Sequence, residues 1–495
     1  MPNLITWEVN NILYFSTEVF LAFSLCFLLI YSVFYDNNKL IRNVFFVLIF
    51  SILINTSLLI KFISSSETQL VLMNNFTIDT YTLCAKTFIL FLAIISTYIL
   101  KTITTKEINE FIIIFGFSIN AALFLLSSFN WGMVFLSLEF LGICTYCLLG
   151  LLKKNSYITM EATIKYFSIS ALSSCFLLLG IFFFYIIFLD INFLVITENI
   201  FGSESGFVLQ IVAYTILISF LIKLGCAPFH MWVPDVYEGV PTFMTLILSV
   251  VMKSIFFLFF IKIVAYLLAS GVETVKTVLI LSSGISIIIG CFGALFQKKI
   301  KRILAYSSIN NMGYMLIGLS VNSTIGIKAS LMYSFFYFLA VILLFMIILN
   351  TKEINEEGEK INSIVYTSDL HKLKRGSALV LTIFIVTLFS LAGIPPLSGF
   401  FIKFFILKEA IFSKLYVLAT VGAFSSVISA FYYINLIKLT LFDNKPNNNK
   451  LIQIENNYKT VLTILAFSLL LIFAFPYNTE TFFYFLAKSI SYPYS

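Results

Sequence analysis

The sequence predicts an all-α membrane protein that crosses the bilayer about fourteen times. Of its 495 residues, 60% are hydrophobic and only 11% are charged, whereas charged residues make up roughly 25% of a typical soluble domain. The mean hydropathy of +1.01 excludes an ordinary water-soluble fold. Apolar runs of ~20 residues recur along the whole chain, and no alternating pattern indicates a β-barrel.

The apolar runs define the predicted elements. The run 160–188 is longer than a membrane requires, and the run 377–411 is long because Pro395 and Pro396 interrupt it. The predicted spans are 11–34, 42–64, 79–100, 108–128, 131–152, 160–188, 206–229, 241–267, 274–296, 302–320, 326–350, 377–411, 415–442 and 459–487.

Loop charge predicts the orientation of these spans. The formal net charge of +7 comes mostly from short loops after odd-numbered spans, so it does not indicate nucleic-acid binding. By the positive-inside rule, loops 153–158, 297–301 and 351–376 face the matrix or the cytosol, and both termini lie on the opposite side. Residues 1–10 contain no basic residue, which argues against a cleaved signal or transit peptide. Abundant Phe, Tyr, Ile, Asn and Lys indicate an organelle-encoded protein.

Lys223 and Pro228 mark the most informative span. A lysine inside a membrane helix costs about 2.5–3.5 kcal/mol on insertion scales, and a nearby proline frees a backbone carbonyl. Both are tolerated where a helix is broken beside a hydrated charge pathway. Glu139 is the only carboxylate near the centre of an otherwise apolar span, so it is the predicted partner that switches Lys223. The alternative is a static ion pair that fixes helix packing.

Further lysines repeat this pattern. Lys253 lies mid-helix, too deep to reach the interface easily. Lys403 follows the Pro395-Pro396 break, where unwound backbone exposes carbonyls to water or a cation. Lys165 lies four residues after Glu161, so it acts either in proton transfer or in a simple interfacial pair.

Other polar residues have less certain roles. His230 follows the first break and has either a proton-entry role or a loop hydrogen bond. Lys262 and Lys438 lie close enough to helix ends to extend to the interface, and Glu18 and Lys86 are candidates for pairing with partner subunits.

Redox and metal chemistry have little support in the sequence. Cys144 and Cys147 form a CxxC inside an apolar span, where we expect packing residues, although a redox role is the alternative. The chain has two histidines and no GxGxxG or phosphate loop, so we predict no bound cofactor and no metal.

The two broken spans indicate an internal repeat. Spans four to eight and nine to thirteen each have a break in their fourth member, and a unit of five helices must recur inverted. We therefore expect four parts: 1–105 with three N-terminal helices, 106–268 and 269–442 as inverted five-helix repeats, and 443–495 with the last helix.

Four stretches carry a resemblance to a known family. They are KLGCAPFHMWVPDVYEGVPTFMTLILSVVMK (223–253), EATIKYFSISALSS (161–174), KRILAYSSINNMGYMLIGL (301–319) and SLAGIPPLSGFFIKF (390–404). With these the chain resembles the antiporter-like subunits of respiratory complex I, the proton-pumping NADH:ubiquinone oxidoreductase, and within them the subunit 2 family. Asn311 departs from the pattern, because many relatives have histidine there.

The resemblance implies a proton-translocating role. It assigns this role to Glu139, Lys165, Lys223, Lys253 and Lys403. It implies a mitochondrial inner membrane, or a bacterial plasma membrane, with other membrane-arm subunits and lipids such as cardiolipin as partners. NADH, FMN, iron–sulfur clusters and ubiquinone are then expected on other subunits. The alternatives are a subunit of a cation/proton antiporter with the same fold, and a membrane scaffold whose charges form static pairs.

Overall fold

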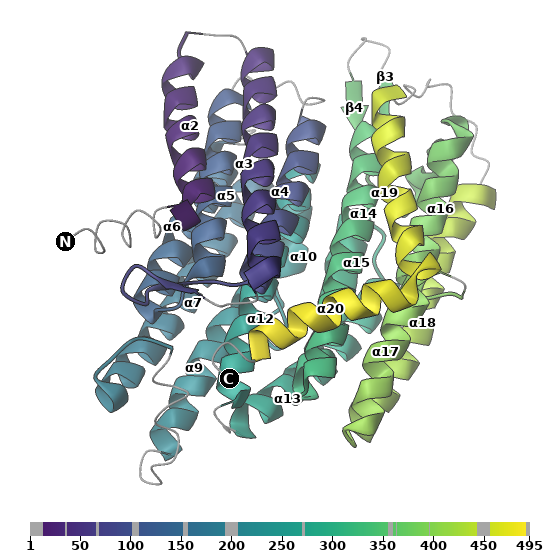
Figure 1. Ribbon diagram of the computed structural model, residues 1–495. Helices are drawn as coiled ribbons and strands as arrows, with labels where there is room; N and C mark the ends of the chain where they lie inside the picture. The colour runs from purple at the N-terminus through teal and green to yellow at the C-terminus, as the bar shows by residue number, and fades with distance from the viewer. Residues whose placement is uncertain are drawn as a thin grey trace. The chain divides into compact units, whose positions relative to one another are not determined.

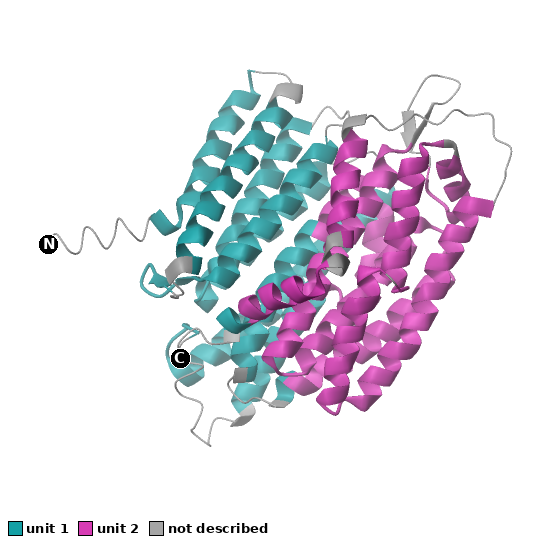
Figure 2. Ribbon diagram, turned by 45° about the vertical axis from the view of Figure 1, so that its right-hand side comes forward, with its two compact units in different colours: residues 1–223, 251–275, 488–495 teal, residues 224–250, 276–487 magenta. Residues whose placement is uncertain are grey.

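Helices dominate the computed structural model, as the composition predicts (Figure 1). The structure describes residues 13–34, 37–65, 69–100, 108–151, 157–193, 206–269, 273–354, 360–362, 364–395, 397–442 and 456–491. The chain forms two compact units, coloured separately in Figure 2: unit 1 comprises 1–223, 251–275 and 488–495, and unit 2 comprises 224–250 and 276–487. The predicted division into four parts stays a prediction.

Unit 1 is built from helices whose apolar residues pack against one another. Helix α3 packs on α4, and α5 packs on both α2 and α6. A short antiparallel hairpin of β1 (Gln69–Val71) and β2 (Phe76–Ile78) precedes α4. The helices are α2 (Ser16–Ser32), α3 (Asn37–Ser65), α4 (Thr80–Leu100), α5 (Ile108–Ser127), α6 (Trp131–Leu151), α7 (Tyr157–Phe188), α9 (Gly206–Leu224, of which Leu224 belongs to unit 2) and α12 (Lys253–Ala269).

Unit 2 packs around α15 (Thr324–Asn350), whose side chains are almost all buried. Ser323 caps this helix by accepting a hydrogen bond from the Gly326 N–H at 3.0 Å. The other helices are α10 (Trp232–Gly239), α11 (Thr242–Leu246), α13 (Glu273–Leu295, from Lys276 on), α14 (Ile300–Ser320), α16 (Ala378–Ala392), α17 (Ser398–Phe412), α18 (Tyr416–Phe442), α19 (Asn456–Ala474) and α20 (Pro476–Ser491, up to Ala487). A 3₁₀ helix, η2 (Thr367–Arg375), and a hairpin of β3 (Lys352–Ile354) and β4 (Lys360–Asn362) complete it.

Both predicted breaks are present. Helix α9 ends at Leu224, and Gly225 has φ +68°, a left-handed conformation in which a Cβ would lie 2.3 Å from Val233. The chain turns through Pro228 before α10 begins. The second break separates α16 from α17 and contains Pro395, whereas Pro396 lies outside the described residues. Glycine and proline residues thus interrupt the helices where the sequence predicts.

Within the described residues, each predicted span is mainly helical, but the helices differ in length and continuity. Nine helices of the described chain are long and apolar enough to cross a membrane by length and composition, so the count of fourteen stays a prediction. The last predicted span, 459–487, is wrong as a single helix. It consists of α19 and α20, because Pro476 cannot continue α19 and instead starts α20, which runs crosswise to α19 in Figure 1.

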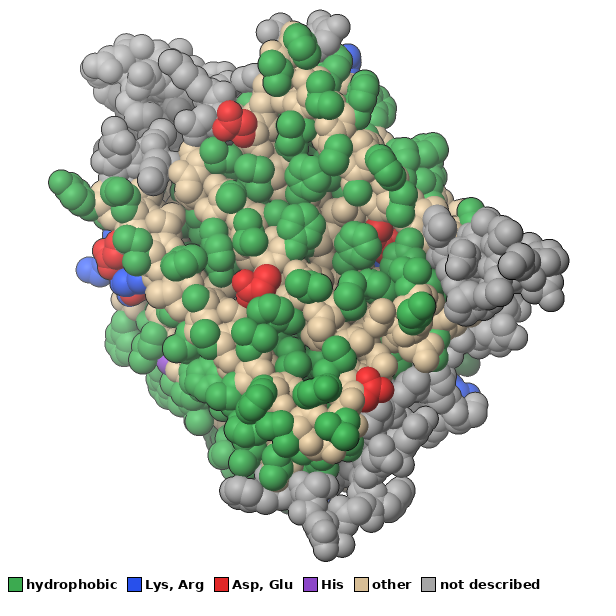
Figure 3. Space-filling view, turned by 90° about the vertical axis from the view of Figure 1, so that its left-hand side faces the viewer, with side chains coloured by type: hydrophobic (Ala, Val, Ile, Leu, Met, Phe, Trp, Pro, Cys, Tyr) green, Lys and Arg blue, Asp and Glu red, His purple; other side chains and the backbone are tan. Residues whose placement is uncertain are grey.

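The surface is that expected of a membrane protein. Hydrophobic side chains predominate on the face in Figure 3, with few charged ones among them. In α7, for example, Ile164, Phe182 and Tyr185 are all more than half exposed. A soluble monomer rarely exposes such extended apolar patches, so this surface indicates contact with lipid or with other membrane subunits.

Candidate functional site

The second break binds the ammonium group of Lys403. Its Nζ donates to the carbonyl oxygens of Leu391 at 3.0 Å and Ala392 at 3.1 Å, and lies 3.5 Å from Ser429 Oγ. These carbonyls belong to the last turn of α16 and are available because the helix stops there. The negative end of the α16 dipole also favours a cation at this place. The broken helix therefore provides a binding site for a buried positive charge.

Two glycines make this geometry possible. Gly393 ends α16 with φ +83°, and a Cβ there would lie 3.0 Å from Lys403 Cδ. Its N–H donates to the Phe389 carbonyl at 3.1 Å, which closes the helix end. At Gly399 a Cβ would lie only 1.7 Å from the Ser390 carbonyl oxygen. The sequence AGIPPLSG therefore brings α17 directly against the end of α16.

Aromatic and hydroxyl groups extend this site within unit 2. Lys403 Nζ lies 5.4 Å from the centre of the Tyr314 ring, a cation–π distance. Tyr314 Oη donates to the Gly422 carbonyl at 2.6 Å and stacks on Tyr333. The Tyr333 hydroxyl donates in turn to Asn311 Oδ1 at 2.7 Å. Asn311, the residue that departs from the family pattern, is thus an acceptor in a buried polar chain.

Some buried polar atoms in the described part of unit 2 form no hydrogen bond of good geometry. Among them are both amide atoms of Asn310 and the hydroxyls of Tyr432 and Tyr433. A buried polar group without a partner costs about 1–3 kcal/mol. Several such groups together favour an interior that accommodates water.

Unit 1 contains Lys223 at the last turn of α9, where a cation is favoured by the helix dipole. Its side chain is buried, and Nζ lies 5.6 Å from the centre of the Phe256 ring. The half-buried Glu139 of α6 stabilises the Lys223 charge electrostatically. Both residues lie in unit 1, and their role as a switching pair stays a prediction.

Lys253 is 1% exposed and begins α12. It directly follows a π-helical segment, η1 (Ile247–Met252), a feature that the sequence does not reveal. Such segments recur at functional sites because they re-aim the following side chains. Phe256, which contacts Lys223, lies three residues later on the same helix face. Lys253 and Lys223 thus share one region of unit 1.

The remaining predicted residues lie in different surroundings. Lys165 forms an ion pair with Glu161 at 2.6 Å on α7, with 37% and 62% of the side chains exposed. This is the pairing that the spacing predicts. His230 is buried, with Nδ1 3.3 Å from the Pro228 carbonyl oxygen, so the predicted loop contact is present. Cys144 is buried and Cys147 exposed, and neither is in a disulfide.

Residues 128–429 match the family described as NADH:quinone oxidoreductase/Mrp antiporter, TM. The chain belongs to this family. The matched region contains Glu139, Lys223, Lys253 and Lys403 and both helix breaks, so the arrangement described above lies within the family domain.

Curated relatives place the chain more closely within the family. It is 32% identical over 476 residues to NADH-ubiquinone oxidoreductase chain 2 of Marchantia polymorpha, covering 93% of this chain and 94% of the relative. It is 33% identical over 478 residues to NADH-quinone oxidoreductase subunit N of Pelagibacter ubique, covering 94% of this chain and 97% of the relative. The resemblance to the subunit 2 family is thereby confirmed.

Solved structures establish the antiporter-like fold. A chain of respiratory complex I from Thermus thermophilus matches with a TM-score of 0.76 at 22% identity, over 94% of this chain and 98% of that one. A chain of the Mrp complex from Dietzia sp. matches with a TM-score of 0.84 at 17% identity, over 97% and 98%. Fold similarity alone does not separate these assemblies.

One ion-pair network of the domain has no counterpart in our sequence predictions. Glu238 of α10 forms ion pairs with Lys299 and, at 3.0 Å, with Arg302. Its hydrogen bond raises the pKa of the Lys299 ammonium above its ordinary value. Asp235 lies 3.7 Å from Arg302. The acidic pair in PDVYEG and the basic run KKIKR are the signal that would have indicated this contact.

The predictions for Glu18, Lys86 and Lys262 require correction. Glu18 and Lys86 pair with each other at 2.5 Å and are both fully buried, so neither is available to a partner subunit. Lys262 does not extend to the interface but is 1% exposed and donates to Thr77 Oγ1 at 2.7 Å. The sequence places these residues in apolar spans but does not show the direction in which their side chains point.

Proposed function

We propose that this chain is a proton-translocating membrane-arm subunit of an NADH:quinone oxidoreductase. The observation that supports it most strongly is the burial of Lys223 and Lys403 beside helix breaks, and of Lys253 beside a π-helical segment, in a chain whose relatives are subunits of this oxidoreductase. Desolvation favours the neutral amine, and a nearby carboxylate or carbonyl favours the ammonium. Each lysine is thus a site that holds or releases a proton according to its surroundings.

In the proposed mechanism, Glu139 and Lys223 form the switch. When their contact weakens, the proton affinity of Lys223 falls and its proton passes to Lys253. From there it moves along a hydrated path toward Lys403, whose ammonium is received by the carbonyls of the second break. Lys165, paired with Glu161, is a further proton-transfer residue of this proposal, and His230 admits protons near the first break.

In this proposal the redox chemistry takes place on other subunits. NADH, FMN, iron–sulfur clusters and ubiquinone are bound by other subunits, and this chain couples to them mechanically and electrostatically. The partners are the other membrane-arm subunits, with lipids such as cardiolipin around the exposed apolar helices. The two five-helix parts are inverted repeats of each other. The whole chain crosses the membrane fourteen times. The location is the mitochondrial inner membrane, or the plasma membrane in a bacterium.

A second candidate function is a subunit of a multi-subunit cation/proton antiporter. The TM-score of 0.84 to the Mrp complex favours it at the level of fold. The curated relatives, at 32% and 33% identity over nearly the whole chain, favour the oxidoreductase.

Purification through a tag on this chain tests the proposal. We expect a complex that oxidises NADH with a quinone and, in liposomes, moves protons in a manner that a protonophore abolishes. An antiporter subunit would instead yield sodium–proton exchange that is independent of NADH. Co-purification without NADH oxidation would contradict the proposal.

Accessibility labelling tests the predicted orientation. Lys374 lies in the basic segment 351–376, and Met73 lies at the tip of the β1–β2 hairpin with 87% of its surface exposed. By the positive-inside rule we expect Lys374→Cys to react from the matrix or cytosol side and Met73→Cys from the other. Labelling of both from one side would contradict the assignment.

A further inference from the structure

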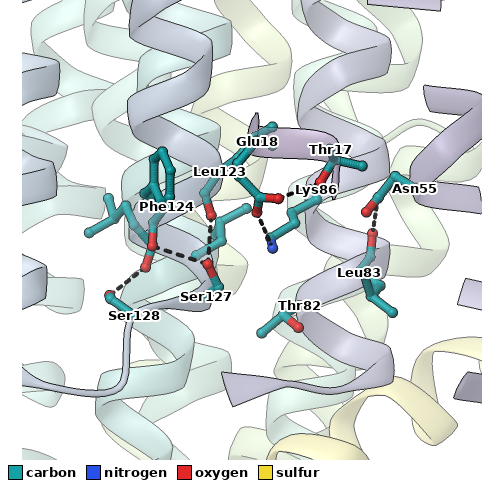
Figure 4. A network of polar contacts seen from close by, with 12 residues as sticks. Thr17, Glu18, Asn55, Thr82, Leu83, Lys86, Leu123, Phe124, Ser127 and Ser128 are labelled. Atoms are coloured by element: carbon teal, nitrogen blue, oxygen red, sulfur yellow. Dashed lines mark hydrogen bonds and ion pairs between the residues drawn. The ribbon is translucent and has the colours of Figure 1, made fainter. Parts of the chain in front are cut away.

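A second group of buried charges lies in unit 1 among the N-terminal helices. Glu18 of α2 and Lys86 of α4 point toward one another in Figure 4, and their Oε1 and Nζ atoms are 2.5 Å apart. Thr17 Oγ1 donates to the other carboxylate oxygen at 2.5 Å. The Lys86 Nζ also lies 5.8 Å from the Phe15 ring centre. Both charged side chains are almost wholly removed from solvent, which is costly unless the pair is well formed.

Lys262 of α12 forms the second part of this group. Its Nζ donates to Thr77 Oγ1 at 2.7 Å and to the carbonyl oxygens of Ser128 at 3.0 Å and Leu126 at 3.3 Å. All three acceptors are neutral. Its ammonium is attracted by Asp79 and repelled by Lys86. Burial also disfavours the charged form of Lys262. Because Glu18 balances the charge of Lys86, the Glu18–Lys86 pair is one of the influences on Lys262.

The other groups around this cluster are polar and confined. Asp79 is buried, and its Oδ1 accepts a hydrogen bond from the Thr82 N–H at 2.7 Å at the start of α4. Asn55, beside Leu83 in Figure 4, and Asn120 of α5 are buried, and their Oδ1 atoms have no hydrogen-bond partner. Two unpartnered acceptors in the same helix bundle indicate places that water can occupy.

Tyr81 contacts α12 between Lys262 and Lys253. Lys253 and Lys262 lie on one helix, nine residues or about 13 Å apart at 1.5 Å per residue. The Tyr81 hydroxyl donates to the carbonyl of Leu258 at 2.6 Å, between the two lysines along α12. A polar group from α4 thus interrupts the otherwise apolar surface between them.

Polar side chains continue from Lys262 toward one end of unit 1. The Asn130 amide donates to Asn75 Oδ1 at 2.9 Å and to Asn192 Oδ1 at 3.1 Å, and Asn192 contacts the half-buried Asp190. Asn130 lies two residues after Ser128, which accepts from Lys262. These asparagines follow predicted spans two, four and six, which end on the side opposite the basic loops.

We propose that Lys262, controlled by the Glu18–Lys86 pair, is a proton-release site that connects Lys253 to the membrane side opposite the basic loops. The proposal rests on the proposed function. A proton leaves the Lys253 ammonium and passes through water and the Tyr81 region to the Lys262 amine, which becomes an ammonium. Lys262 then gives its proton to water near Asn130 and Asp190, and returns to the amine. No other reactant is required.

Substitution of Lys262 by arginine tests this role in the assembled oxidoreductase. Arginine keeps the positive charge and the hydrogen-bond donors, but it does not release its proton. A lysine that only fixes the helices would be replaced adequately. We expect Lys262→Arg to lower the initial rate of proton transport in liposomes by about tenfold or more, because proton release is blocked. Unchanged proton transport with Lys262→Arg would overturn the proposal.

Three further variants make the result decisive. Lys438→Arg, on an exposed position of α18, is the matched control and is expected to transport protons normally. If the Lys262→Arg complex does not assemble, Glu18→Gln provides the test, since it removes the charge that balances Lys86 beside Lys262. Normal proton transport with Glu18→Gln would then overturn the proposal. Lys403→Met distinguishes failure of the proposed function from failure of the release site. If Lys403→Met also leaves proton transport intact, the proposed function fails. If Lys403→Met abolishes transport but Lys262→Arg does not, only the release site is rejected.

Discussion

Glu139→Gln is expected to slow coupled proton transport by about tenfold, the equivalent of 1.4 kcal/mol, while the complex remains assembled. The carboxylate stabilises the charge of Lys223 electrostatically, and glutamine keeps its size but not its charge. Moving one charge across a 100 mV potential requires about 2.3 kcal/mol, which corresponds to a pKa swing on the order of two units. Without Glu139 the lysine loses the partner that supplies this swing.

Lys223→Ala is expected to have at least as large an effect, because it removes the proton-carrying group itself. The measurement is the ratio of protons moved to electrons transferred in liposomes, with complex assembly checked by native electrophoresis. Glu110→Gln, at an exposed position of α5, is the matched control and leaves the ratio unchanged. A normal ratio in an assembled Glu139→Gln complex would favour a static ion pair.

Lys403→Met is expected to abolish most proton transport and also to lower stability. The methionine fills the space of the side chain but leaves the carbonyls of Leu391 and Ala392 without their donor. Each buried carbonyl left unpaired costs about 1–3 kcal/mol, less where water replaces the ammonium. The thermal midpoint of the complex and its proton-to-electron ratio measure the two effects separately.

Lys408→Met is the matched control for this substitution. Lys408 lies on the same helix, α17, but is exposed, with Nζ 5.6 Å from the Phe412 ring centre. We expect nearly normal stability and transport, because no buried acceptor loses a partner. Equal effects of the two substitutions would mean that Lys403 contributes only as a general positive charge of α17.

Local chemistry explains what the sequence predicts well. Helix positions follow from apolar runs, and the breaks near Pro228 and Pro395 follow from residues that cannot continue a helix. The binding of Lys403 by freed carbonyls follows from its place after GIPPLSG. One prediction of this kind was wrong: residues 459–487 form two helices, α19 and α20, instead of one. The run of apolar residues predicted a single span although Pro476 interrupts it.

The sequence by itself determined the helical membrane class and the two interrupted helices, because hydropathy and backbone restrictions act within a few residues. Only the tertiary structure decided which groups meet. Glu18 pairs with Lys86, 68 residues away, and Lys262 binds Thr77, 185 residues away. Such contacts depend on how each helix is rotated about its axis. In a membrane protein both the lipid-facing and the buried sides of a helix are apolar, so the pattern of side chains does not specify that rotation.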